Sequence, residues 1–474
     1  MTTSPPESFY WYDLETSGTD PRWDRVMQFA GVRTDLDLNE IGDEYTTYVK
    51  LPLDVLPQPE SCLITGLTPQ FINARGIDEL HFFSRVDELF STGNTCVAGY
   101  NNLRFDDEFM RYGFYRHLID PFAREWRNGN SRWDLIDLVR AAHALRPDGV
   151  HWPHEEQLPT FRLSALTAAN NIGHAHAHDA ASDVRATIAV ARLIKTAQPR
   201  LFDFYLSMRR REVARRVLDV GNWRMCLHVS GMYPRDRNCI APIVAIAAHP
   251  HNGNTIIVAD LGRDVTPLVD CDAHDIRQTL FSREAPERPG LKEVRVNRCP
   301  FIAPFGVLRL EDQKRLQVDV DVAATRLRRL RNCTGLVEKI QQVYARQRDG
   351  NGHADADVRL YDGFWSDADR SRCGLARRAL LDGQDPRAWR FDDDRIPELI
   401  RRIRWRMSVF DSEEDRRAWL RVVGKKIQLE DRPYVTVTSF RETVDSLGTD
   451  GLNDLMRNQL LEHLGDTIDL VVDR

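Results

Sequence analysis

Residues 8–198 alternate short apolar runs with helical stretches, and this alternation limits the fold more than any other feature of the chain. Phe9 to Leu14 is an aromatic and apolar run that Thr16-Ser17-Gly18 ends, as expected of a strand followed by a turn. Residues 96–100 have the pattern of a second buried strand, and residues 179–198 carry apolar side chains at helical spacing. The pattern predicts an α/β domain over residues 8–198, with further strands over 25–33 and 45–51 and further helices over 106–117 and 133–145.

The pattern changes at Gln198-Pro199, because a proline there ends the last of these helices. Residues 199–350 contain short β-type runs broken by Gly, Pro and Asn, and they close with a helical stretch over 322–347. Residues 348–356 are rich in Gly, Asp and His and are interpreted as a linker. Residues 357–474 are mainly helical and highly charged. A chain of 474 residues is expected to form about three domains, here an α/β, a β-rich and a helical domain.

Composition argues against a secreted or membrane protein. The first eight residues are polar and lack a basic segment leading into an apolar one, so no signal peptide is expected. No apolar run approaches the roughly 20 residues that a membrane span needs. The eight cysteines are scattered without a C-x-x-C pair, which is typical of reduced, mostly buried thiols in a cytoplasmic protein and does not favour a structural zinc ribbon.

The net charge of −6 is not typical of a nucleic-acid binder, although arginines gather in three places. Each cluster is predicted to be a solvated helix face. Trp405, inside the third cluster, is predicted to lie in the core rather than to stack on bases. The clusters are Arg209–Arg211 with Arg215 and Arg216; Arg326, Arg328, Arg329 and Arg331; and Arg401, Arg402, Arg404 and Arg406.

Two carboxylates stand at the end of the first predicted strand, in Asp13-Leu14-Glu15. Strand side chains alternate, so both point to the same face of the sheet. At about 4 Å they repel by about 4 kcal/mol at an effective dielectric constant near 20, so they either share a proton or hold a cation. A single D-x-E triplet is also typical of a solvated turn.

Two further segments change that interpretation. Asp106 directly follows the strand over 96–100, with Phe105 expected to turn inward as an anchor. Asp183 falls on the first turns of the helix over 179–198, and His178 lies in the loop before it. The order D-x-E, N-x-x-F-D and H-x-x-x-x-D resembles the motif set of the DEDDh exonucleases, which have an RNase H-like fold.

The chemistry of phosphodiester hydrolysis explains these residue types. Water attacks an anion, and two divalent ions roughly 3.5–4 Å apart can neutralise the attacking and leaving oxygens together. Carboxylate oxygens select Mg²⁺, with Mn²⁺ as a substitute, so Asp13, Glu15, Asp106 and Asp183 are predicted to hold two ions. A histidine, with a pKa of about 6.5, can take a proton from the attacking water, and this role is predicted for His178.

Several neighbouring residues are predicted to have other roles. His174, His176 and His178 alternate as in zinc hydrolases, but without a further Cys or His cluster His174 and His176 are expected to be exposed loop residues. Asp107 is expected to be solvated, and Asp179 to cap the following helix. Asp134 and Asp137 are interpreted as capping or surface residues. From the residues alone, Arg162 is equally compatible with a surface side chain and with a substrate contact.

Beyond these motifs, the chain resembles the bacterial exodeoxyribonuclease I family over nearly its whole length. The resemblance is carried by Tyr12-Asp13-Leu14-Glu15-Thr16, Leu56-Pro57-Gln58-Pro59, residues 64–69, 99–102, 130–134, 144–147 and 198–203, His228-Val229-Ser230-Gly231-Met232 and Gly363 to Arg370. It implies an RNase H-like exonuclease domain over 8–198, an SH3-like domain over 199–350 and a helical C-terminal domain over 357–474. From about residue 371 onward the sequence departs from that family's pattern.

The family's activity is the single-strand-specific 3′→5′ removal of 5′-mononucleotides from DNA, in repair and recombination. The resemblance therefore implies a magnesium-dependent cytoplasmic monomer, with Asp13, Glu15, Asp106, Asp183 and His178 as catalytic residues. It implies substrate contacts by Glu15, Thr16 and Arg162. It also implies that Arg146 lies in a pocket for the acidic C-terminal tail of single-stranded-DNA-binding protein, with a similar basic stretch around Arg315.

Two other interpretations remain. Another DEDDh nuclease, such as an oligoribonuclease or a polymerase proofreading subunit, would not need the two additional domains. A non-catalytic binding module on the same scaffold would be expected to have lost carboxylates, whereas all four and the histidine are present.

Overall fold

The computed structural model describes residues 7–174, 178–282, 284–285, 287–345, 355–429, 432–451 and 454–472. The chain forms two compact units. The first contains Met1–Ser131, Ala175–Arg185 and Gly350–Arg474, and the second contains Arg132–His174 and Ala186–Asp349. These units do not coincide with the three expected domains, whose boundaries therefore stay a prediction.

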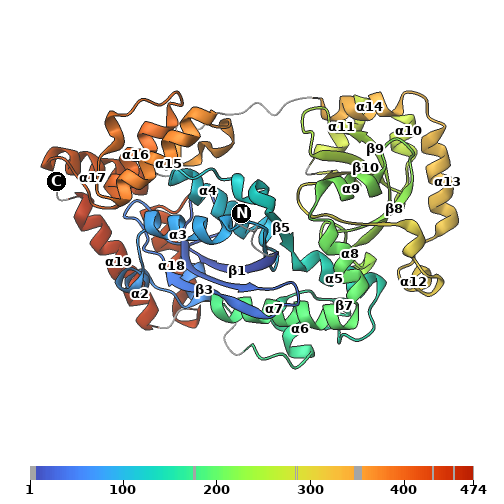
Figure 1. Cartoon of the computed structure of the whole chain (residues 1–474), viewed down its shortest axis with the longest axis horizontal. Coiled ribbons are helices and arrows are strands. Elements are labelled where there is room, and N and C mark those ends of the chain that lie inside the picture. The colour runs from blue at the N-terminus through green and yellow to red at the C-terminus, as the bar shows by residue number, and fades with distance from the viewer. Residues whose placement is uncertain are drawn as a thin grey trace, which may run out of the picture. The chain divides into compact units, whose positions relative to one another are not determined.

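A five-stranded sheet with the order β3-β2-β1-β4-β5 organises the N-terminal part of the chain (Figure 1). β1 pairs antiparallel with β2 and parallel with β4, and β2 pairs antiparallel with β3. The strands predicted near residues 9–14, 25–33 and 96–100 are confirmed, whereas β3 begins five residues before the expected start. The bounds are β1 Ser8–Thr16, β2 Val26–Thr34, β3 Glu40–Tyr48, β4 Thr95–Gly99 and β5 Ser131–Asp134.

Alternation along β1 places the two carboxylates on the opposite face of the sheet from one of its apolar cores. Tyr10, Tyr12 and Leu14 pack in one core with aromatic side chains of α3 (Glu79–Ser91) and α4 (Asp106–Arg116). Since successive strand residues point to opposite faces, Asp13 and Glu15 lie on the other face of the sheet. The helix predicted over 179–198 is α7 (Ala180–Ala197).

Two predicted helices differ in the structure, one in its start and one in its continuity. Trp133 belongs to β5, and helix α5 (Leu135–Leu145) begins only after Asp134, whose carboxylate accepts a hydrogen bond from the Ile136 amide at 3.1 Å. The stretch over 322–347 is two helices, α13 (Val320–Arg331) and α14 (Leu336–Tyr344). Gly335 separates them with a φ of 75°, a left-handed conformation that a continuous helix cannot contain.

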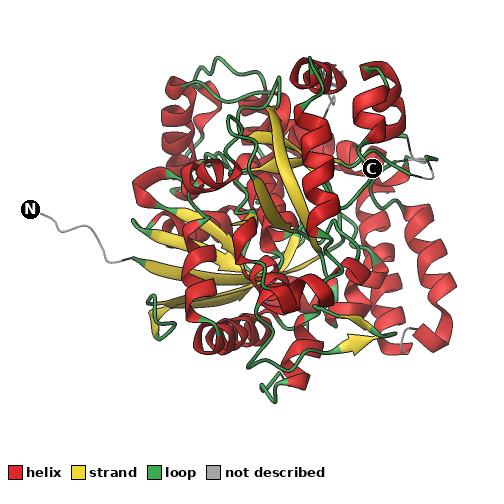
Figure 2. Cartoon of the chain, turned by 90° about the vertical axis from the view of Figure 1, so that its right-hand side faces the viewer, coloured by secondary structure: helices red, strands yellow, loops and turns green. Residues whose placement is uncertain are grey.

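The second unit contains a five-stranded antiparallel sheet with the order β11-β10-β9-β8-β12. In Figure 2 the strands, in yellow, gather in sheets while helices make up much of the rest. The strands of this second sheet are β8 Met225–Val229, β9 Ile240–Ala248, β10 Thr255–Asp260, β11 Leu291–Arg295 and β12 Phe301–Pro304. The unit also contains α6 Leu163–Ala169, α8 Pro199–Ser207, α9 Arg211–Leu218, α10 Thr266–Asp270, α11 Ala273–Phe281, α12 Leu310–Arg315, and the short strands β6 His154–Glu155 and β7 Leu158–Pro159.

The described residues between 355 and 472 are mainly helical, as predicted, and their core continues that of the N-terminal segment. Trp405 and Trp419 pack with Leu56 and Cys62 in one apolar cluster, which confirms that Trp405 lies in the core. Trp365 likewise packs with Tyr112 and Tyr115 of α4 in another. The helices are α15 Asp367–Leu381, α16 Arg395–Arg406, α17 Glu413–Gln428, α18 Val437–Gly451 and α19 Asp454–Val472, and the N-terminal segment adds α1 Pro59–Thr65 and α2 Pro69–Arg75.

The third arginine cluster is not the solvated helix face that was predicted. Arg404 is buried, and the side chain of Arg406 is only 6% exposed. Arg406 donates hydrogen bonds to Asp54, at 2.8 and 3.0 Å, and to Asp357. Lys426 binds the same Asp54 carboxylate at 2.9 Å. Asp357 also pairs with Arg402 at 3.2 Å and with Arg25 of the N-terminal segment at 3.4 Å. We call Arg25, Asp54, Asp357, Arg402, Arg406 and Lys426 the buried ion network.

The cysteines are free thiols, and most of them are buried, as predicted. Among the described residues, none of the helices combines the length and the apolar character needed to span a bilayer.

Candidate active site

The two strand carboxylates lie beside an irregularity of the sheet. Across the antiparallel pair, Ala30 of β2 faces Asp13 and Gln28 faces Glu15. The register then shifts between Glu15 and Thr16, and such a bulge turns a strand end away from regular pairing. Ala30 offers only a methyl group opposite Asp13, so β2 contributes no large side chain directly opposite this carboxylate.

The turn after β4 brings Asp106 to the same region. A Cβ atom on Gly99 would lie 2.8 Å from the backbone oxygen of Tyr12, so only glycine permits this close approach of β4 to β1. Asn101 then turns the chain with a φ of 65°, and α4 begins at Asp106, which is buried. Phe105 packs against Phe109 at 5.0 Å between ring centroids and against the core, as predicted.

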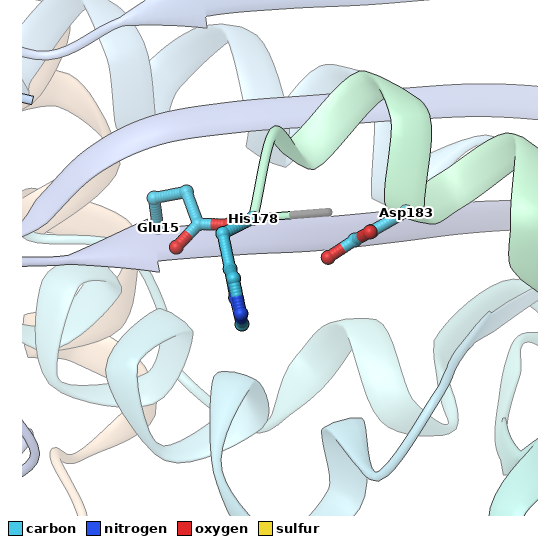
Figure 3. A group of neighbouring side chains, drawn as sticks. All are labelled: Glu15, His178 and Asp183. Atoms are coloured by element: carbon cyan, nitrogen blue, oxygen red, sulfur yellow. The ribbon is translucent and has the colours of Figure 1, made fainter. Parts of the chain in front are cut away.

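The start of α7 supplies the remaining two residues. Asp183 lies in the first turn of the helix. His178 precedes the helix, is exposed and has a φ of 67°, a conformation that is uncommon for a residue other than glycine. One ligand atom from each of Glu15, His178 and Asp183 lies within 4.8 Å of the others (Figure 3).

In the described part of the chain, His178 therefore groups with carboxylates rather than with other histidines. His174 is half-buried and its Nδ1 lies 3.2 Å from the Thr167 hydroxyl, so it is not the exposed residue that was expected. His176 lies outside the described residues.

The four carboxylates lie close enough together for their charges to raise the pKa values of Asp13 and Glu15. Burial first, then the charges of Asp106, Glu15 and Asp183, raises the pKa of Asp13 well above its usual range. Burial, followed by Asp183 and Asp106, raises the pKa of Glu15 to about 8. Two buried carboxylates, Glu15 and Asp106, and two half-buried ones, Asp13 and Asp183, supply hard oxygen ligands, and such a set fits a divalent cation. The site can hold a metal ion.

Asp107 was expected to be solvated, but it is completely buried. The Tyr12 hydroxyl donates to its Oδ1 at 2.8 Å, and Arg124 donates to the same oxygen at 2.7 Å. The successive residues of α4 point about 100° apart, so Asp106 turns to the site while Asp107 turns to the core. Asp107 therefore braces the strand residue that precedes Asp13.

Asp179 caps α7 as predicted, because its Oδ2 accepts a hydrogen bond from the Ser182 amide at 3.2 Å. Its Oδ1 accepts a second bond, at 2.8 Å, from the side-chain amide of Gln28. Gln28 was not among the residues predicted from the sequence. Its position opposite Glu15 is the signal that could have identified it, but the strand register must be known first.

The remaining predicted residues differ in their surroundings. Thr16 is buried, and its hydroxyl donates to the Gly18 carbonyl at 2.8 Å, which stabilises the turn after β1. Arg162 precedes α6 in the second unit; its side chain is 74% exposed and lies 3.3 Å from Glu155. Arg146 is the C-cap residue of α5, also in the second unit. Its guanidinium lies 3.5 Å from the carboxylate of Asp312, which also accepts a hydrogen bond from Arg315 at 3.0 Å.

The sheet order, the carboxylates from three segments and the adjacent histidine define an exonuclease with an RNase H-like fold. Residues 10–191 match the family model described as exonuclease. Residues 209–346 match the exonuclease I SH3-like domain, and residues 354–468 match the exonuclease I C-terminal domain. Exodeoxyribonuclease I of Haemophilus influenzae is 41% identical over 400 residues, which cover 83% of this chain and 85% of that protein. The chain belongs to the exodeoxyribonuclease I family.

Solved structures agree with this assignment. An exonuclease I from Methylocaldum szegediense has a TM-score of 0.92 at 44% identity, covering 98% of this chain and all of that one. The zinc-bound form of an Escherichia coli exonuclease I complex with single-stranded DNA has a TM-score of 0.90 at 37% identity, covering 99% of this chain and all of that one. The expected exonuclease, SH3-like and helical C-terminal regions are thereby confirmed, and the chain is a hydrolase of the exonuclease class.

Proposed function

We propose that this chain degrades single-stranded DNA from its 3′ end, releases 5′-mononucleotides, and acts in DNA repair and recombination as a cytoplasmic monomer. The observation that carries the proposal is the convergence of Glu15, Asp183 and His178 within 4.8 Å, next to the carboxylates of Asp13 and Asp106. The single-stranded DNA bound to the Escherichia coli relative supports the same substrate class.

The carboxylates of Asp13, Glu15, Asp106 and Asp183 would hold two Mg²⁺ ions, and Mn²⁺ would replace them. When bound, such ions neutralise charge on the attacking and leaving oxygens of the phosphodiester. The raised pKa of Asp13 and of Glu15 supports this assignment, because like charges packed in a buried site need a cation to stay ionised together.

His178 is the general base of the proposal. It would take the proton of the attacking water at an imidazole nitrogen that lies close to Glu15 and Asp183. General-base catalysis contributes roughly 10²–10⁴-fold to a rate, so His178→Ala should lower kcat by about that factor with little change in DNA affinity. A fully active His178→Ala enzyme would remove His178 from the mechanism.

Substrate contacts are assigned to Glu15, Thr16 and Arg162. Thr16 would act beside the terminal nucleotide through the turn that its hydroxyl stabilises. Arg162 presents an exposed guanidinium, whose paired N–H donors suit a phosphate of the substrate strand. Arg162→Ala should therefore raise KM more than it lowers kcat, which steady-state kinetics on a single-stranded oligonucleotide would measure.

Arg146 would receive the acidic C-terminal tail of single-stranded-DNA-binding protein. Arg146, Arg309 and Arg315 surround the buried Asp312, and Arg309 also pairs with Glu311 at 3.0 Å. Three cations therefore face two carboxylates and keep a net positive charge at this surface. Leu310 is largely exposed beside them and offers an apolar contact. Binding of a fluorescent acidic tail peptide should weaken at least tenfold in Arg146→Ala, while cleavage of naked DNA stays unchanged; equal binding by both proteins would reject this pocket.

Digestion of a 5′-labelled single-stranded oligonucleotide with Mg²⁺ tests the proposal as a whole. The blunt duplex, an RNA of the same sequence and an EDTA reaction serve as controls, together with Asp13→Ala, which should bind DNA without cutting it. Shortening of single-stranded DNA only, from its 3′ end and abolished by EDTA, is the expected result. Efficient RNA cleavage would favour a broader nuclease, and binding without cleavage under any metal would favour an inert module.

A further inference from the structure

Gln28 is a buried amide placed beside the candidate metal ligands. It lies on β2, is only 2% exposed, and faces Glu15 across the strand pair. Residues that face each other in an antiparallel pair share one face of the sheet, so Gln28 lies on the face that carries Asp13 and Glu15.

Both ends of the Gln28 amide contact the start of α7. Its Nε2 donates to Asp179 Oδ1 at 2.8 Å, and its Oε1 accepts a hydrogen bond from the Ala180 amide at 3.4 Å. Asp179 Oδ2 is occupied by the Ser182 amide. Together these three bonds engage both oxygens of Asp179 and fix the helix start to β2.

We call Gln28 and Asp179, with these three hydrogen bonds, the clamp. It lies between two residues that the proposed reaction needs. On its N-terminal side lies His178, exposed and in a left-handed conformation; on its C-terminal side, in the first turn, lies Asp183. Asp179 is itself close enough to raise the pKa of both Asp13 and Glu15, so it is a fifth carboxylate at the edge of the site. With both oxygens engaged, Asp179 is kept as a helix cap.

We propose that Gln28 is a positioning residue for hydrolysis. By holding Asp179 and the Ala180 amide, it sets the orientation of Asp183 and of His178, and it keeps Asp179 from binding the metal ions in place of Asp183. The inference rests on the roles proposed above for His178 and Asp183. A purely structural amide would instead stabilise the fold without altering turnover.

An exchange of donor and acceptor distinguishes these possibilities. Gln28→Glu puts two carboxylates in contact and loses the donor. Asp179→Asn offers one oxygen where two donors need acceptors. The double variant Q28E/D179N restores all three bonds and keeps the wild-type net charge. The carboxylate introduced at position 28 accepts hydrogen bonds from the side-chain amide introduced at position 179 and from the Ala180 backbone amide. The side-chain oxygen at position 179 still accepts a hydrogen bond from the Ser182 amide. Each single variant should lower kcat about 10- to 100-fold with little change in KM, as small misplacements of catalytic groups do, and the double variant should return to within about threefold of the wild type.

Gln70→Glu is the matched control, because Gln70 is also a partly buried amide of the first unit, hydrogen-bonded to the Gln459 carbonyl. It should lower the melting temperature without lowering kcat. The proposal fails if the single variants at Gln28 and Asp179 behave like this control, or if the double variant stays as slow as Q28E.

Binding of Mn²⁺ to each variant separates a failure of this proposal from a failure of the roles proposed for His178 and Asp183. An active His178→Ala enzyme would remove the proposed base, whereas restoration of both kcat and Mn²⁺ affinity in the double variant would still support the clamp through Asp183.

Discussion

Replacing Asp357 with asparagine should destabilise the first compact unit, because this buried carboxylate pairs with three guanidiniums that have little access to solvent. Its side chain is 2% exposed and contacts Arg406, Arg402 and Arg25. Burial alone would raise the pKa of Asp357, but these three arginines outweigh it and hold the pKa well below the usual carboxyl range. The charged form is therefore strongly favoured in the folded protein.

The magnitude follows from the charge that is left behind. Removing one partner of a buried ion pair costs about 3–5 kcal/mol when the remaining charge is left without compensation. Here Arg406 keeps Asp54 and Arg402 keeps Asp355, so a cost near the lower end, about 3 kcal/mol, is expected. Asparagine keeps the size of the side chain and one acceptor, so the loss reflects the charge rather than a cavity. Such a cost is a large fraction of the roughly 5–15 kcal/mol that stabilises a typical domain.

Urea unfolding at neutral pH, followed by tryptophan fluorescence, to which the buried Trp405 and Trp419 of this unit contribute, measures the effect. Asp367→Asn is the control, since Asp367 is exposed and forms a surface ion pair with Arg370 of its own helix, and its unfolding midpoint should change little. The contribution of Asp357 should be complete above its unfolded pKa of about 4, and it should disappear as the pH falls through its depressed folded pKa. A free energy of unfolding for Asp357→Asn that differs by less than about 1 kcal/mol from the wild type would refute this account of the network.

Three other predictions concern separate parts of the chain. Gly99→Ala should lower turnover at least tenfold and destabilise the protein by about 1–3 kcal/mol, because the new Cβ would lie 2.8 Å from the Tyr12 oxygen next to Asp13; Gly374→Ala, where nothing lies within 4 Å, should do neither in the same assays. Burial, then Arg315 and His154, lowers the pKa of His143 to about 4, so stability should fall as the pH decreases from about 6.5 to about 4, by at most about 3 kcal/mol. His143→Gln should make that slope shallower in thermal melts, and an unchanged slope would exclude His143 as its cause. For Asp13→Ala, the logarithm of the association constant for single-stranded DNA should fall by about 0.7 per tenfold increase in salt for each phosphate that the protein neutralises. A slope near zero would contradict an extended basic path.

The residues of the candidate site were predictable because their spacing along the chain carries the signal. Asp13 and Glu15 are two positions apart on a strand, and His178 and Asp183 flank a helix start. Local geometry therefore already places the two members of each pair close together. Gln28 was not predictable, since its role depends on which residue of β2 faces Glu15, and the bulge at that point shifts the register.

Burial was harder to predict than identity. Asp107 has the same residue type as its neighbour Asp106, and only the partners Tyr12 and Arg124 decide that it turns to the core. Arg406 has the pattern of a solvated helix face, but its acceptor Asp54 lies 352 residues away in the sequence. A pattern within one helix carries no information about a charge contributed from so far along the chain.

The division of the chain into units has a consequence for its biosynthesis. The first unit needs residues before 131 and residues after 350, so its core stays incomplete while roughly 220 intervening residues are translated. At about 5–20 residues per second this takes roughly 10 to 40 seconds. Trp405 has not been synthesised during this time, so it does not yet cover the apolar side chains of Leu56 and Cys62. The second unit, whose last residues precede those of the first, is expected to fold earlier on the ribosome, and the nascent nuclease segment is expected to need a chaperone until the C-terminal helices emerge.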